Sequence, residues 1–244
     1  MRVVQAVFFL LVVRPLLALV LGVNLRHAER LPKAGPAILA ANHNSHLDTL
    51  LLMSLYPLAE LHRLRPVAAA DYFLKNRIVA WFALNVMHIL PLARRPKRTP
   101  SPFIPERGQS SPRSGEHPDG HKGARVMPRP INEPPLAHLE AALDAGDILI
   151  LFPEGSRGEP EKRGALKTGI AHLMERAPAV PVVPVYLHGL GKALPRGDWL
   201  PVPFFADGFV GEPLTWQGSR AETMQVLEGR FAELERQGGR PAWE

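Results

Sequence analysis

The stretch PAILAANHNSHLDTLLL, residues 36–52, contains the change from strand to helix that decides the fold. Its first half, from Pro36 to Asn42, is a short apolar run that is typical of a strand buried on both faces. Helical spacing of apolar residues then runs from about His46 to Tyr56. Ionisable side chains lie at the seam. They have three possible interpretations: a helix cap, a metal site, or a catalytic base with its orienting acid.

The same change recurs along the chain. Strand-like runs and helical runs alternate downstream: LRPVAAADYF, a helix near 74–84, VMHILPLARR, a helix at 136–145, DILILF, LKTGIAHLMERAP, AVPVVPVYLHG, FVGEPLTW and an amphipathic helix at 221–237. This alternation predicts an α/β fold with a mostly parallel, mixed sheet that is flanked by helices. Because proline cannot donate to a strand ladder, Pro181 and Pro184 suggest that their strand lies at an edge.

The N-terminus is apolar from Val3 to Val23 and, as one helix, would span about 31 Å, close to a bilayer core. Arg14 and Pro15 interrupt this run in the middle, where a cation and a missing backbone donor are both unfavourable. We therefore expect a broken or tilted helix that lies in one leaflet, with its arginines (Arg2, Arg14, Arg26 and Arg30) reaching the headgroups. The alternative is a buried core helix.

Composition predicts two regions and one insert. We expect a hydrophobic membrane-associated segment at 1–30 and a single domain at 31–244, with a disordered, proline-rich and basic insert at 96–133. The formal net charge of +6 favours an anionic partner. Cysteine is absent, which excludes disulfides, thiolate metal sites and a cysteine nucleophile.

The first candidate site is the segment NHNSHLD, residues 42–48. His43 follows a strand, and active sites of open α/β sheets lie at the carboxyl ends of strands. Asp48 lies in the first helical turn, where it is able to orient the imidazole, although the spacing Ser45-x-x-Asp48 is also that of a capping box. A metal site would use His43, His46 and Asp48.

The second candidate site is LILFPEGSRG, residues 149–158, where a buried strand runs into a glycine-rich turn. Gly155 and Gly158 allow the backbone to approach a ligand, and Arg157 offers a planar cation suited to phosphate. Ser156 lacks a glycine two positions before it, which argues against a serine hydrolase.

Together the two segments resemble the glycerolipid acyltransferases of the 1-acylglycerol-3-phosphate acyltransferase type. His43 and Asp48, after Asn42, match their His-x4-Asp motif, and residues 152–157 match Phe-Pro-Glu-Gly-Thr-Arg with serine for threonine. Further similar stretches are ILPLARR with Arg94, LKTG at 166–169, VPVVPVYLHG at 180–189 and GEPL at 211–214. In the ILPLARR region, His88 and Ala93 stand where the family more often has glycine and aspartate.

The resemblance implies a glycerol-3-phosphate acyltransferase-like fold and transfer of a fatty acyl group from acyl-CoA or acyl carrier protein to a lysophospholipid hydroxyl. The acceptor it favours is 1-acylglycerol-3-phosphate, which would give phosphatidate. His43 would be the general base and Asp48 its orienting acid. The substrate-binding residues it implies are Glu154, Gly155 and Ser156 around the acceptor, and Arg94, Arg157 and Lys167 for its phosphate.

The resemblance implies no resident cofactor, because the acyl thioester is itself a substrate. The expected partners are a membrane lipid acceptor, the acyl carrier and an anionic membrane surface, with no nucleic acid. The expected location is the cytoplasmic face of the cell membrane, where acyl donors are available. Other hypotheses remain: another acceptor such as a lyso-aminolipid, a metal-dependent hydrolase, or a lipid-binding protein without activity.

Overall fold

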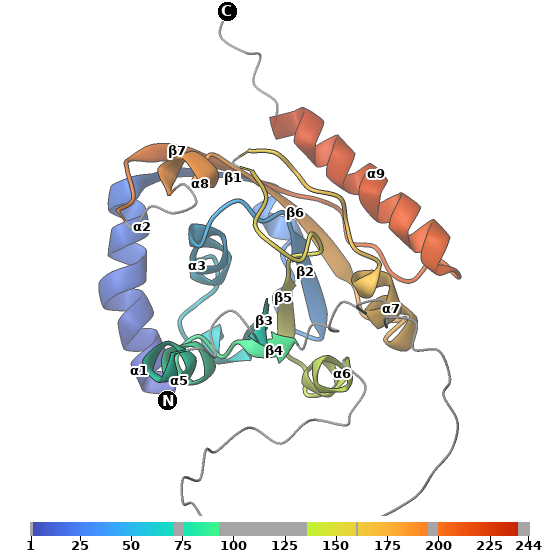
Figure 1. The fold of residues 1–244 in the computed structure, drawn as a ribbon, viewed down its shortest axis with the longest axis horizontal. Coiled ribbons are helices and arrows are strands. Elements are labelled where there is room, and N and C mark those ends of the chain that lie inside the picture. The colour runs from blue at the N-terminus through green and yellow to red at the C-terminus, as the bar shows by residue number, and fades with distance from the viewer. Residues whose placement is uncertain (1, 71–75, 93–135, 160, 195–199, 239–244) are drawn as a thin grey trace, which may run out of the picture.

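A computed structural model describes residues 2–70, 76–92, 136–159, 161–194 and 200–238. These residues form a seven-stranded sheet with the order β1-β7-β6-β2-β5-β3-β4. All strand pairs in it are parallel except β6 with β7. The predicted α/β fold with a mostly parallel, mixed sheet is therefore confirmed (Figure 1). The strands are β1 Leu21–Arg26, β2 Ala37–Ala41, β3 Leu64–Ala69, β4 Leu90–Leu92, β5 Ile148–Leu151, β6 Val182–His188 and β7 Phe204–Val210.

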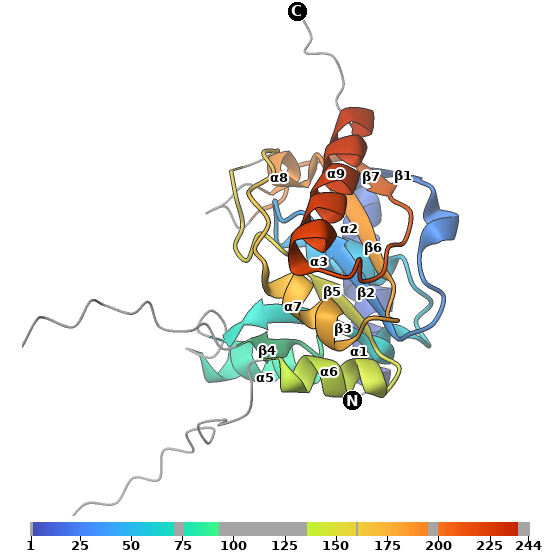
Figure 2. The same cartoon turned by 90° about the vertical axis from the view of Figure 1, so that its right-hand side faces the viewer.

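Helices cover both faces of the sheet, which makes a three-layer arrangement (Figures 1 and 2). The N-terminal helical segments, α3 and α5 lie on one side, and α6, α7 and α9 lie on the other. The helices are α1 Arg2–Phe8, η1 Phe9–Val13, α2 Arg14–Val20, η2 Ala28–Arg30, α3 Leu47–Ser54, η3 Leu61–Arg63, α5 Arg77–Asn85, α6 Ala137–Asp144, α7 Gly169–Arg176, α8 Leu190–Ala193 and α9 Arg220–Gly238.

The central strands β2 and β5 are apolar along their whole length because both faces of the sheet are covered by helices. Successive side chains of a strand point to opposite faces, so neighbouring residues of β2 enter different cores. Leu39 packs in the cluster that includes Phe9 and Leu52, whereas Ile38 packs in the cluster that includes Phe231. Because both faces need apolar residues, these strands have continuous rather than alternating hydrophobicity.

The N-terminal helix is continuous from Arg2 to Val20, with a π-helical section at η1. It has 19 residues and a mean hydropathy of 2.4, so its length and composition would allow it to cross a membrane, as would those of some core helices and signal sequences. One face packs on the sheet through Phe9, Val13 and Leu17, while Leu11 and Leu19 on the other face are exposed. The helix is therefore packed on the domain along one side and apolar on both sides.

Two expectations about this region need correction. The predicted apolar helix ends at Val20, and the following residues form β1, which pairs with β7 at the sheet edge. Arg14 was expected to reach lipid headgroups, but this prediction is wrong: its guanidinium donates to the carbonyl oxygen of Tyr56 at 2.8 Å, inside the fold. The main-chain acceptor holds the end of this half-buried side chain against the domain, although Arg14 Nε has no partner in the described structure.

The predicted edge position of Pro184 is also wrong, because β6 lies between β7 and β2. The Pro184 carbonyl accepts from the amide of Gly211 at 2.8 Å, and Gly211 directly follows the last residue of β7. Pro184 therefore lies at the end of the β6–β7 ladder. Because it has no N–H group, the ladder lacks only one hydrogen bond, at its end. The insert predicted at 96–133 lies outside the described residues.

Candidate active site

The two segments singled out in the sequence meet at the carboxyl ends of neighbouring strands. His43 follows β2, Glu154 follows β5, and these strands pair in parallel. The amide of His43 donates to Glu154 Oε1 at 3.1 Å, and the amide of Gly158 donates to the carbonyl of His43 at 3.2 Å. Parallel pairing thus brings together residues more than a hundred positions apart.

His43 and Asp48 form the predicted pair, with 2.9 Å between His43 Nδ1 and Asp48 Oδ2. Asp48 is fully buried in the first turn of α3, and the same oxygen accepts from the amides of Asn44 and Ser45 at 2.6 and 2.8 Å. Burial raises the pKa of the Asp48 carboxyl, and these hydrogen bonds oppose the rise. One carboxylate therefore both orients the imidazole and holds the turn that precedes α3.

The His43 ring is held on a second side by Phe152, which stacks on it with centroids 4.0 Å apart and planes at 20°. Its side chain remains 17% exposed. Because Nδ1 is committed to Asp48, Nε2 is the nitrogen left to exchange a proton with a substrate. The ring is thus fixed in position and reachable from outside.

Buried amide side chains hold this loop in place, a feature that the sequence analysis did not foresee beyond naming Asn42. The Asn42 side chain donates to the Leu187 carbonyl at 2.8 Å and accepts from the Leu187 amide at 2.6 Å. Asn44 donates to the same carbonyl at 3.0 Å, and the Ser45 hydroxyl donates to the Leu194 carbonyl at 3.1 Å. The only signal in the sequence was a run of polar residues between two apolar ones.

Glu154 joins the loop that carries His43 to the loop that carries Gly164 by hydrogen bonds. It is 5% exposed, and its second oxygen accepts from the amide of Gly164 at 3.0 Å. Burial raises the pKa of the Glu154 carboxyl, and the hydrogen bonds from Gly164 and His43 oppose that rise. Both carboxylate oxygens accept from main-chain amides, so Glu154 holds in place the loop that carries Gly155, Ser156 and Arg157.

The remaining predicted residues of this turn lie near one another. Gly155 has φ +72°, and a Cβ there would collide with the Lys167 side chain, so the glycine lets Lys167 lie across the turn. Ser156 is exposed, and Arg157 is half-buried. Partial burial of the ring, together with Arg157 and His43, lowers the pKa of His46 to about 4. Arg157 therefore lies close to this end of the site.

Two other predictions, the phosphate ligand Arg94 and the alternative metal site, have no support from the described geometry. Arg94, the expected second phosphate ligand, lies outside the described residues. Among the residues that the structure describes, no three histidine, cysteine or acidic side chains gather as ligands of a metal ion. The metal-dependent hydrolase built on His43, His46 and Asp48 thus has no supporting geometry in this part of the chain.

A second, half-buried pair supports the loop after Glu154, and no pattern in the sequence indicated it. Glu161 contacts His188 Nδ1 at 2.8 Å and accepts from the amides of Gly189 and Gly191 at 2.7 and 3.0 Å. Burial acts to raise the pKa of Glu161, but these partners outweigh it and the pKa is lowered. Arg163 ties the other side of the loop to α9 through Glu228 at 2.8 Å.

Comparison with known proteins shows a family match and a similar fold. Residues 22–188 match the acyltransferase family. The chain is 27% identical over 177 residues to the chloroplastic 1-acyl-sn-glycerol-3-phosphate acyltransferase LPAT1 of Arabidopsis thaliana, covering 72% of this chain and 38% of that protein. This chain thus spans well under half of that relative's length. The fold is similar to the crystal structure of the 1-acyl-sn-glycerophosphate acyltransferase PlsC from Thermotoga maritima, with a TM-score of 0.60, 19% identity, and coverage of 89% of this chain and 73% of that one.

Proposed function

The chain belongs to the acyltransferase family, and we propose that it transfers a fatty acyl group from acyl-CoA or acyl carrier protein to the free hydroxyl of a lysophospholipid. The acceptor we propose is 1-acylglycerol-3-phosphate, with phosphatidate as the product. The observation that carries the reaction is the bond between His43 Nδ1 and buried Asp48, which leaves Nε2 as a base at the carboxyl end of β2.

In the proposed reaction, His43 Nε2 takes the proton of the acceptor hydroxyl as its oxygen attacks the thioester carbonyl carbon. Asp48 stabilises the imidazolium that forms. The tetrahedral intermediate collapses, the carbon–sulfur bond breaks, and the imidazolium returns the proton to the thiolate. An ester and a free thiol result, and no covalent acyl-enzyme is required.

The proposed acceptor follows from the cations near this base. Arg157 influences His46 and is within electrostatic reach of the loop that carries His43. A guanidinium binds a phosphate monoester through paired hydrogen bonds. We assign Arg157, with Lys167 and Arg94, to the phosphate of the acceptor, and Glu154, Gly155 and Ser156 to the shape of its site. The names of the two relatives, both lysophosphatidate acyltransferases, support the same acceptor.

We also propose that the protein works at the cytoplasmic face of the cell membrane, with the helix from Arg2 to Val20 lying in one leaflet. Packing of Phe9 and Val13 on the domain supports a helix that lies along the membrane, since spanning would separate these side chains from the core. The exposed Leu11 and Leu19 would face the acyl chains. A lysolipid then reaches the site without leaving the bilayer.

The test is release of free CoA by detergent-solubilised protein from acyl-CoA with lysophosphatidate, other lysolipids, monoacylglycerol or no acceptor. We expect lysophosphatidate to be the best acceptor and His43→Ala to lower the rate by about 10²–10⁴-fold. His46→Ala is the matched control, and we expect it to remain within about tenfold of the parent. Preference for another lysolipid would discard the acceptor, and release without acceptor would indicate a thioesterase. Lysolipid binding without turnover in the folded parent would contradict the reaction.

A further inference from the structure

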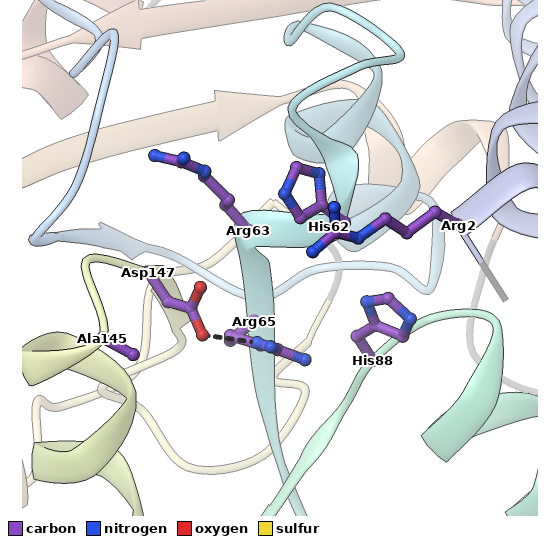
Figure 3. A pocket seen from close by; sticks show the side chains of 7 residues that line it. All are labelled: Arg2, His62, Arg63, Arg65, His88, Ala145 and Asp147. Atoms are coloured by element: carbon purple, nitrogen blue, oxygen red, sulfur yellow. Dashed lines mark hydrogen bonds and ion pairs between the residues drawn. The ribbon is translucent and has the colours of Figure 1, made fainter.

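A second group of ionisable side chains surrounds a pocket of about 270 Å³, whose lining includes Arg2, His62, Arg63, Arg65, His88 and Asp147 (Figure 3). Arg65 lies at the start of β3, and Asp147 directly precedes β5. The pocket is therefore at the amino ends of the parallel strands, whereas His43 and Glu154 follow carboxyl ends. The length of β5 separates the two places.

The pocket carries an excess of positive charge. With neutral histidines, three arginines against one carboxylate give 3 − 1 = +2. Arg65 Nε pairs with Asp147 Oδ2 at 2.7 Å, and Arg63 approaches Glu60 at 3.6 Å on the surface. Within the described part of the chain, Arg2 makes no ion pair. Figure 3 shows Arg2 pointing toward His62 and Arg65 toward His88, so an anion between them would meet cations from two sides.

His88 is held in this pocket at a conformational cost. Its φ of +52° is in the left-handed region, which glycine adopts freely and other residues adopt only at a cost in free energy. Its Nδ1 is also buried without a hydrogen-bond partner in the described structure. Burial, and then Arg65, lower the pKa of His88, while the backbone of His62 and the Asp147 carboxylate oppose this. Backbone strain and an unsatisfied nitrogen at one residue are typical of a functional position.

The surface beside the pocket is apolar. Arg2 begins α1, where Val3 and Leu11 are 75% and 66% exposed. Phe8 of α1 contacts Phe82 of α5, with ring centroids 5.1 Å apart, so the two helices lie side by side (Figures 1 and 2). In α5, Ile78 and Trp81 are exposed as well. An apolar surface with cations at its border fits the interface of an anionic bilayer.

We propose that this pocket binds the phosphate group of an anionic phospholipid, at a site separate from the catalytic one. Its volume is slightly below the roughly 300–1,000 Å³ of typical small-molecule pockets, which suits a headgroup rather than a whole lipid. The acyl chains of that lipid would lie against α1 and α5. This inference does not depend on the acyl transfer proposed above, because no catalytic residue lines the pocket.

The test compares flotation of the full chain with vesicles of phosphatidylcholine, with and without phosphatidate. The pocket variant is Arg2→Gln with His88→Gly, in which glycine suits the backbone at position 88. The matched control is Arg77→Gln, which removes one positive charge at the start of exposed α5. We expect the pocket variant to lose the preference for phosphatidate by about 30-fold, and the control by about fivefold or less, as one diffuse surface charge would.

A direct measurement accompanies it. In micelles, the imidazole ¹⁵N signal that disappears in His88→Gly should shift when short-chain phosphatidate is added. Equal losses in the two variants, or no shift of this signal, would overturn the proposal. An equal response to inorganic phosphate would overturn the lipid source and leave a site for free phosphate. Thermal unfolding of each variant verifies that it is folded.

Discussion

The two ends of the parallel sheet both combine histidines with charged residues, and they differ in how these groups are satisfied. At the carboxyl end, His43 bonds to Asp48, and the same Asp48 oxygen also accepts from two main-chain amides. Each end also has a buried polar atom without a partner in the described structure, His88 Nδ1 at the amino end and Asp48 Oδ1 at the carboxyl end. At the amino end, however, the exposed Arg2 makes no ion pair with the described residues. Hydrogen bonds within the protein hold His43 in one orientation before a substrate arrives, whereas an exposed cation without an ion pair, such as Arg2, can pair with a ligand from outside.

The largest effect should come from removing the internal acid at the carboxyl end. Asp48→Asn puts an amide where three donors converge, so the His43 tautomer is no longer fixed and the imidazolium is no longer stabilised. We expect acyl transfer to fall by about 10²–10⁴-fold while the fold is kept. CoA release measures the rate, and circular dichroism verifies the fold. A variant with near-parent activity would mean that Asp48 only caps α3.

A smaller effect is expected for the cation proposed to bind substrate. Arg157→Gln removes a charged donor, and a hydrogen bond to a charged group contributes about 1.5–3 kcal/mol. The KM for lysophosphatidate should rise by about 10–100-fold, with little change for monoacylglycerol, which has no phosphate. Steady-state kinetics with both acceptors measures this difference. Equal loss on both acceptors would show that Arg157 positions the loop instead.

A change in stability, dependent on pH, is expected for the pair beside the site. Glu161→Gln weakens the bonds to His188, Gly189 and Gly191, and should lower the free energy of unfolding at pH 7 by about 1–3 kcal/mol. Because the folded-state pKa of Glu161 is below its ordinary value of 4.5, this stabilisation is full above that pH and is lost as pH falls through the folded value.

Urea unfolding of parent and variant at pH 7 and below pH 4 measures that difference, which should shrink on acidification. Glu159→Gln is the matched control, because Glu159 is exposed and, among the described residues, its carboxylate pairs with exposed Lys162 alone, at 2.7 Å. We expect little change from it at either pH. A difference for Glu161→Gln that is the same at both pH values would contradict a role of its charge.

The smallest effect is expected for a substitution at the amino ends of the strands. His88→Gly should leave acyl transfer in detergent within about twofold of the parent, because His88 lies at the far edge of the sheet. Stability should change by no more than about 1 kcal/mol, since relief of the left-handed strain offsets the entropy that glycine gains in the unfolded chain. Loss of activity comparable to Asp48→Asn would mean that the two ends are not independent.

Most of the sheet and one half of the site were predictable from the sequence. Strands buried on both faces have a local signature, and so does the turn from strand to helix at His43. β1 was missed because the apolar run from Val3 continues across Val20 without a break, so hydrophobicity alone does not locate the end of the helix. Pro184 is tolerated in a central strand because the pairing of β6 with β7 ends beside it, and strand pairing is not encoded in the local sequence.

Two groups that assemble from distant positions and belong to no motif escaped the sequence analysis. Glu161 and His188 are 27 positions apart, and Glu161 lies in a loop without periodicity. The amino-end pocket combines Arg2 with His88 through the contact of α1 and α5. His88 did differ from the residue expected at its position, and its left-handed backbone explains why glycine would suit that position.

The absence of a linker between α2, which ends at Val20, and β1, which begins at Leu21, has a mechanical consequence. Helix and domain share a core, so they turn and tilt as one rigid body. With the helix lying in a leaflet as proposed, the height of His43 above the bilayer midplane is fixed by the fold. The protein would then find its substrates by lateral diffusion in two dimensions, and that height would have to match the depth of the free hydroxyl of the lysolipid.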